Sequence, residues 1–94
     1  MSYYTNYTLE HDGGVGVDIA IEANEMKYAV GDSREACKWY DYEKDMIAFS
    51  KMFPKVTFIL TGEGEESGDL WKAKFKNGRV STVKAILTYP DFDF

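Results

Sequence analysis

The chain has 94 residues, of which 45% are apolar and 16% aromatic, so it suits one domain with a hydrophobic core and is too apolar for disorder. No apolar run approaches the ~20 residues of a membrane span, and the first residues do not resemble a signal peptide. We therefore expect a cytoplasmic protein. The single cysteine, Cys37, excludes an internal disulfide and a cysteine-based zinc site.

Charge is distributed unevenly along the chain. Residues 1–47 contain ten acids and four bases, which gives −6, whereas residues 48–94 contain six acids and seven bases, which gives +1, for a net charge of −5. The lysines and the arginine of residues 70–84 follow one another with no acid between them. This pattern predicts a molecule with an acidic side and a basic patch.

The alternation of residues 3–10 predicts a first strand. Residues 17–25 have two interpretations, because their apolar residues alternate as in a strand, whereas Asp18 is a suitable helix cap. We favour a short helix, since residues 26–30 themselves have a strand pattern and no turn residue separates the two segments. Residues 36–40 are expected to be extended, with Cys37 and Trp39 on a buried face.

A helix is predicted from Asp41 to the residue before Pro54. Its stripe of large apolar residues has spacings of i, i+4, i+7 and i+11 and consists of Tyr42, Met46, Phe49 and Phe53. A strand follows over residues 56–60, with Val56, Phe58 and Leu60 directed toward the helix.

The next strand, residues 70–76, directs Trp71, Ala73 and Phe75 to the core and its three lysines outward. Two turns fit Lys76-Asn77-Gly78. A two-residue turn pairs Trp71 with Lys84 and places that lysine on the core face. We favour a three-residue loop, which pairs Phe75 with Arg79 and Trp71 with Val83. It places Val83, Ala85, Leu87 and Tyr89 on the core face of a last strand that ends at Pro90.

The predicted order is strand, helix, strand, helix and a three-strand meander, in a single domain over residues 1–94. The fold class is therefore α+β, with two helices on one face of a mainly antiparallel sheet, in a ferredoxin-like arrangement or a variant of it.

Part of the chain resembles small proteins of phages and conjugative elements. The similarity covers about residues 37–80. Its motifs are Cys37-Lys-Trp-Tyr-Asp, Asp45-Met46, Phe49-Ser50, Phe58-x-Leu60-x-Gly-Glu-Gly-Glu-Glu-x-Gly-Asp69-x-Trp71 and Phe75-Lys-Asn-Gly78. The layout is similar to the ferredoxin-like family named after the plasmid protein YubB. The resemblance implies a fold and a mobile-element setting, in which small acidic proteins often inhibit host defence, anti-CRISPR proteins among them. It supplies no catalytic residues.

Three groups of polar residues are candidate sites. The first is the acidic loop between two strands, with Glu63, Glu65, Glu66 and Asp69. Its carboxylates suit Ca²⁺ or Mg²⁺, but their spacing does not match an EF-hand and the glycines predict a mobile loop, so we assign no metal. The alternatives are a solvated strand connection, or a row of carboxylates offered to a basic partner surface as a phosphate-like decoy.

The second group is the lysine stripe, for which we expect one face to carry Lys72, Lys74, Lys76 and Lys84. This face suits nucleic-acid phosphates, whereas a solvated strand face is the simpler interpretation. The third is a thiolate dyad of Cys37 and His11, which requires the fold to bring the two together; a buried, inert thiol is the simpler expectation.

The sequence thus favours a non-enzymatic binding protein without a cofactor. We expect it to inhibit a host protein with a basic surface through the acidic loop, for example a CRISPR nuclease or another defence effector that handles nucleic acid. The alternative is a nucleic-acid-binding module that uses the lysine stripe. A homodimer through an exposed edge strand is also compatible with the pattern.

Overall fold

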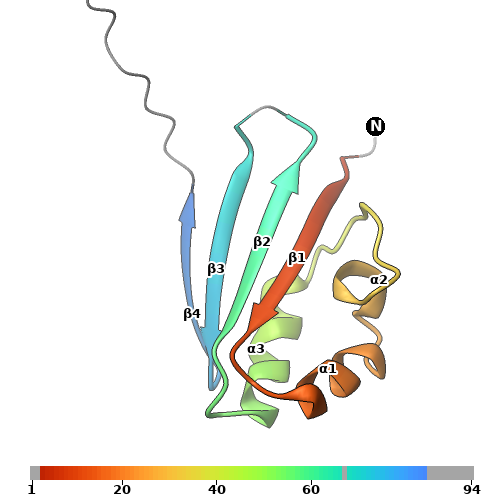
Figure 1. The fold of residues 1–94 in the computed structure, drawn as a ribbon. Helices are drawn as coiled ribbons and strands as arrows, with labels where there is room; N and C mark the ends of the chain where they lie inside the picture. Colours follow the sequence, from red (N-terminus) through yellow and green to blue (C-terminus); the bar gives the residue numbers. More distant parts are fainter. Residues whose placement is uncertain (1–2, 67, 85–94) are drawn as a thin grey trace, which may run out of the picture.

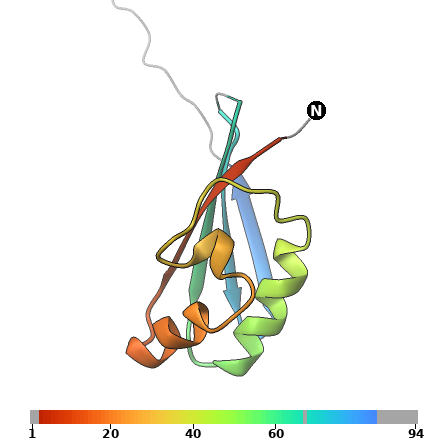
Figure 2. The same ribbon diagram turned by 90° about the vertical axis from the view of Figure 1, so that its right-hand side faces the viewer.

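All helices of the described residues lie on one side of an antiparallel sheet, and no described element covers the other side (Figures 1 and 2). The computed structural model describes residues 3–66 and 68–84. In chain order the elements are β1 (Thr5–His11), α1 (Val15–Glu22), α2 (Lys27–Val30), α3 (Tyr42–Met52), β2 (Phe58–Gly64), β3 (Leu70–Lys76) and β4 (Arg79–Lys84). The four strands of the described sheet follow chain order, β1-β2-β3-β4.

The core lies between the helices and the covered face of the sheet. Strand alternation places one side chain in two on this face, and Phe58, Leu60, Ala73 and Phe75 are fully buried there. Tyr7 of β1 contributes a buried ring that packs edge-on against the buried indole of Trp39, which lies outside the sheet. The prediction that the rings of β2 and β3 face inward while the lysines of β3 face outward is confirmed.

Helix α3 has the predicted apolar stripe. Met46 and Phe49 are buried, and Tyr42 and Phe53 pack against the core at either end. Asp41 occupies the predicted N-cap position, but its side chain makes no capping hydrogen bond. Instead, the indole of Trp39, which is buried as expected, donates to Asp45 Oδ2 at 2.7 Å and fixes the entry to the helix.

The preferred helix around residues 17–25 is confirmed, although it begins earlier, at Val15. The strand predicted for residues 26–30 is wrong, because this segment contains the short helix α2. Its buried residues are Met26, Ala29 and Val30, at i, i+3 and i+4, whereas Tyr28 is 48% exposed. A strand would have buried Tyr28 and exposed Ala29, so the three buried positions fit only a helical stripe.

The hairpin prediction is also wrong, because the turn has two residues, Asn77 and Gly78. Both have positive φ, 47° and 80°, as the hairpin turn favoured by Asn-Gly requires. Trp71 therefore pairs with Lys84. We rejected this register because it places a lysine on the covered side, but β4 is an edge strand and Lys84 is exposed there. The register leaves Val83 63% exposed on the opposite face.

The α+β class, with helices on one face of an antiparallel sheet, is confirmed, and a ferredoxin-like variant is compatible with it. The described sheet has one strand fewer than predicted because residues 26–30 are helical. Ala85, Leu87 and Tyr89, which we expected on the last strand, lie outside the described residues. None of the helices in residues 3–66 and 68–84 combines the length and apolarity needed to cross a membrane.

Candidate functional site

The face of the sheet opposite the helices has no described helix over it (Figure 2). The strand registers define which side chains share this face. They are Asn6, Thr8, Glu10, Ile59, Thr61, Glu63, Leu70, Lys72, Lys74, Lys76, Arg79, Ser81 and Val83. No residue of this set is aromatic, because the rings of the described strands lie on the helix side.

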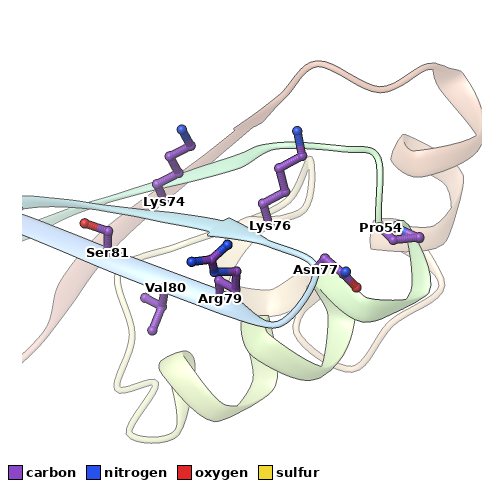
Figure 3. Close-up of a pocket in the computed structure, with 7 residues that line it drawn as sticks. All are labelled: Pro54, Lys74, Lys76, Asn77, Arg79, Val80 and Ser81. Atoms are coloured by element: carbon purple, nitrogen blue, oxygen red, sulfur yellow. The ribbon is translucent and has the colours of Figure 1, made fainter.

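Four cations lie on the β3–β4 half of this face, and we call Lys72, Lys74, Lys76 and Arg79 the basic patch. The three lysines are successive outward residues of β3, and Arg79 pairs directly with Lys76 across the hairpin. All four side chains are exposed. Two lysines and the arginine border an open depression of about 500 Å³, together with Pro54, Asn77, Val80 and Ser81 (Figure 3).

The close-up shows Lys74, Lys76 and Arg79 projecting from the same side of the hairpin, whereas Val80 points to the opposite side (Figure 3). Lys84 was predicted to share the face of the β3 lysines and does not, because the two-residue turn shifts β4 by one position. Arg79 takes its place in the patch. The sequence signal that would have found Arg79 is the Asn-Gly turn itself, which favours a two-residue connection.

The helix layer holds this hairpin in place through one buried hydroxyl. Ser50 of α3 is fully buried, and its Oγ accepts a hydrogen bond of 2.8 Å from the backbone N–H of Gly78. The same hydroxyl donates to the Ile47 carbonyl at 2.9 Å. Gly78 directly precedes Arg79. The hydrogen bond to Ser50 therefore fixes the turn end of the β3–β4 hairpin, whose strands carry the basic patch.

The basic patch has no neutralising partner among the described residues. Within residues 3–66 and 68–84, the only ion pair closer than 4.0 Å is that of His11 with Asp18. Residues 70–84 contain five bases and no acid, which gives +5. The carboxylates that share the open face belong to β1 and β2. Glu63 pairs with Leu70 and is therefore the diagonal neighbour of Lys72, whereas Glu10 lies two strands, or about 10 Å, from Lys74. The patch therefore presents an unbalanced positive potential to solvent.

The four carboxylates predicted as a partner site have different surroundings. Glu63 belongs to β2 and lies on the open face opposite Asn6. Glu65 accepts a hydrogen bond of 3.0 Å from the backbone N–H of Tyr4. The hydroxyl of Tyr3 donates to Asp69, and this hydrogen bond is the main cause that raises the pKa of the Tyr3 phenol.

Glu66 makes a hydrogen bond to the Tyr3 hydroxyl through its backbone N–H, at 3.3 Å, and its side chain is exposed. Two of the four carboxylates, Glu65 and Asp69, therefore hold the N-terminal segment against the β2–β3 connection. In the described part of the chain, no group of three or more His, Cys, Asp or Glu side chains is arranged to hold a metal ion.

The fold separates the two members of the predicted dyad. Cys37 pairs with Thr5 at the start of β1, whereas His11 is the last residue of the same strand, about 20 Å away by strand rise. The His11 ring instead accepts from the Gly13 N–H at Nδ1, at 3.1 Å, and faces Asp18 at Nε2, at 2.6 Å. Burial raises the pKa of the Cys37 thiol, which opposes thiolate formation.

Fold and surface together define a class: a small α+β domain with a four-stranded antiparallel meander, helices on one face, and a positively charged open face. No protein-family model, curated protein or solved structure matches this chain. A fold does not by itself determine a function, which depends on the residues of the surface.

Proposed function

We propose that this chain is a non-catalytic binding protein that holds the phosphate backbone of a single-stranded nucleic acid on the basic patch. The observation that carries this proposal is the group of four exposed cations on an uncovered sheet face, with no carboxylate of the described residues in ion-pair contact. An anionic ligand gains attraction to these cations without first breaking existing ion pairs.

The spacing of the cations favours a strand of phosphates over a single anion. Lys72, Lys74 and Lys76 repeat at every second residue of β3, so their Cα atoms are about 7 Å apart in one row. This interval is comparable to that of successive phosphates in an extended nucleic-acid strand. Arg79 adds a guanidinium beside the last lysine, with the planar geometry that suits bidentate phosphate contacts.

The absence of aromatic side chains from the open face of the described strands limits the mode of binding. Single-strand binders usually stack bases on aromatic rings, which adds about 1–3 kcal/mol per base. Here phosphate contacts supply the affinity, so we expect modest, sequence-independent binding with a steep dependence on salt. Four phosphate contacts predict a slope of about −3 for the logarithm of affinity against the logarithm of salt concentration.

The test is fluorescence anisotropy with a labelled oligothymidylate over a series of salt concentrations. The double variant Lys74→Glu/Lys76→Glu should weaken binding strongly and flatten the salt dependence. Its matched control is Lys27→Glu/Lys44→Glu, which makes the same change in net charge on exposed positions of α2 and α3. Equal losses in both variants would show that net charge alone acts, and would overturn the proposal.

Two further measurements accompany this test. Thermal melting of each variant establishes that the fold is retained. Polyglutamate of matched charge, used as a competitor, distinguishes a nucleic acid from an acidic protein. If polyglutamate displaces the oligonucleotide at equal charge concentration, the basic patch recognises acidic proteins and the assignment to nucleic acid is wrong.

A second candidate function is inhibition of a basic host protein by this chain as a product of a phage or mobile element. Glu63 and Glu66 favour it, because both side chains are exposed, whereas Glu65 and Asp69 already bind the N-terminal segment. The test is capture of partners from a host lysate with the wild type and with Glu63→Lys/Glu66→Lys. A partner retained equally by both would remove the acidic loop from consideration.

A further inference from the structure

The geometry points to a second binding surface on the helix side: a groove between α2 and α3 that takes a basic, amphipathic segment of a protein partner. The groove has a volume of about 390 Å³. Its lining comes from the connection between α1 and α2, from α2 and from α3, and comprises Asn24, Glu25, Met26, Tyr28, Asp45, Ala48, Phe49 and Met52. This surface is separate from the basic patch and does not depend on the function proposed for it.

The groove has an apolar floor, and its border is part apolar and part polar. Met26 and Phe49 form part of the core and are 3% and 2% exposed, so they offer a fixed base. Tyr28 and Met52 border it and are 48% and 59% exposed, so both side chains are accessible to a ligand. Methionine side chains are flexible and polarisable, so the exposed Met52 at the border adapts to different apolar anchors.

The acidic charge around the groove favours a partner segment with basic residues. Its two charged lining residues, Glu25 and Asp45, are both acidic, and no base lines it. Residues 12–52, which carry all three helices, contain nine acids and five bases, which gives −4. A partner segment with one face of large apolar residues and flanking lysines or arginines matches both the walls and the field around them.

The test uses a labelled model peptide made only of leucine and lysine, with leucines at helical i, i+3, i+4 and i+7 positions. The variant Tyr28→Ser/Met52→Ser removes the apolar border without changing charge, and we expect about tenfold weaker binding. The matched control is Val15→Ser/Ile19→Ser on α1, which removes two side chains that are 73% and 65% exposed outside the groove. Equal weakening by both variants would overturn the proposal.

Charge reversal separates groove binding from general attraction to an acidic protein. Glu25→Lys at the groove should weaken peptide binding more than Glu43→Lys, an exposed residue of α3 outside the groove. Equal effects would reduce the interaction to non-specific electrostatics and contradict the proposal. Thermal melting and oligonucleotide binding by the same variants establish that the fold and the basic patch are intact.

A second copy of the chain is the competing occupant. Sedimentation of the protein alone distinguishes the two occupants. If the wild type is a dimer and Tyr28→Ser/Met52→Ser is a monomer, the groove serves self-association and the partner proposal is overturned. A species that stays monomeric while it binds the peptide supports the proposal.

Discussion

The buried Ser50 hydroxyl and the Gly78 backbone N–H are 2.8 Å apart, although 28 residues separate them in sequence. This hydrogen bond joins the last turn of α3 to the turn of the hairpin whose strands carry the basic patch. We expect Ser50→Ala to leave the Gly78 N–H without its acceptor and to lower the free energy of unfolding by about 1–3 kcal/mol. Urea denaturation measures the loss, and Ser81→Ala, on an exposed strand position, is the control that should change stability little.

Gly62 is needed where β2 crosses the Trp71 indole. A Cβ at this position would lie 2.2 Å from two ring atoms of Trp71, so Gly62→Ala must displace the indole and its stacked neighbour Tyr42. We expect a loss of about 1–3 kcal/mol or more, visible in thermal melting and in tryptophan fluorescence. Gly16→Ala is the matched control, because nothing lies within 4 Å of its Cβ. It lies within α1 and should stabilise by about 0.5–1 kcal/mol.

Phe49→Asp should unfold the domain. The Phe49 ring is 2% exposed, and its centroid lies 5.5 Å from the ring centroids of both Phe53 and Phe58. A carboxylate at this position is therefore buried without a partner. The loss of the ring and the cost of the buried charge together approach the whole stability expected for a domain of this size. Circular dichroism is the measurement, and Ala48→Asp, at the neighbouring exposed position, should keep the wild-type spectrum. A cooperative, wild-type-like melt of Phe49→Asp would contradict the assigned orientation of α3.

Stability should fall in alkaline solution because of buried tyrosines. Burial is the main cause that raises the pKa of Tyr7 and Tyr42 above 10.0. The unfolded chain therefore releases these protons at a lower pH than the folded chain does. This contribution is fully present below about pH 10 and is lost as the pH rises through the folded-state pKa values.

Denaturation at about pH 8 and about pH 11 measures this effect. Tyr42→Phe should show a smaller loss than the wild type, because it keeps the ring beside Trp71 and removes the proton. Tyr40→Phe is the control, since Tyr40 is 84% exposed. Identical losses in wild type and Tyr42→Phe would show that other groups determine the alkaline limit.

The sequence predicted the inward face of β3 and the helix α3 correctly, because the spacing of apolar residues within each segment is sufficient to indicate its structure. The stripe of α3 and the alternation of Trp71, Ala73 and Phe75 need no knowledge of distant residues. By contrast, Met26–Val30 has too few residues for its period to be decided, and tertiary burial of Ala29 determined the outcome.

The candidate sites depended on long-range geometry to different degrees. The outward direction of Lys72, Lys74 and Lys76 followed from alternation, whereas Arg79 and Lys84 exchanged faces because our register argument assumed that every covered side chain is buried. The hydrogen bonds of Glu65 and Asp69 to the N-terminal segment join residues more than 60 positions apart. No pattern in the loop could indicate them. The groove between α2 and α3 was missed for a related reason, since α2 was predicted as a strand.

The opposite signs of the helix layer and the β3–β4 hairpin make the molecule an electrical dipole, even though its overall charge is negative. A polyanion and a cationic protein approaching in solution will each rotate it toward a different end before contact, and added salt will weaken that steering for both. If both proposals hold, a ligand on one of the two proposed surfaces would leave the other surface accessible.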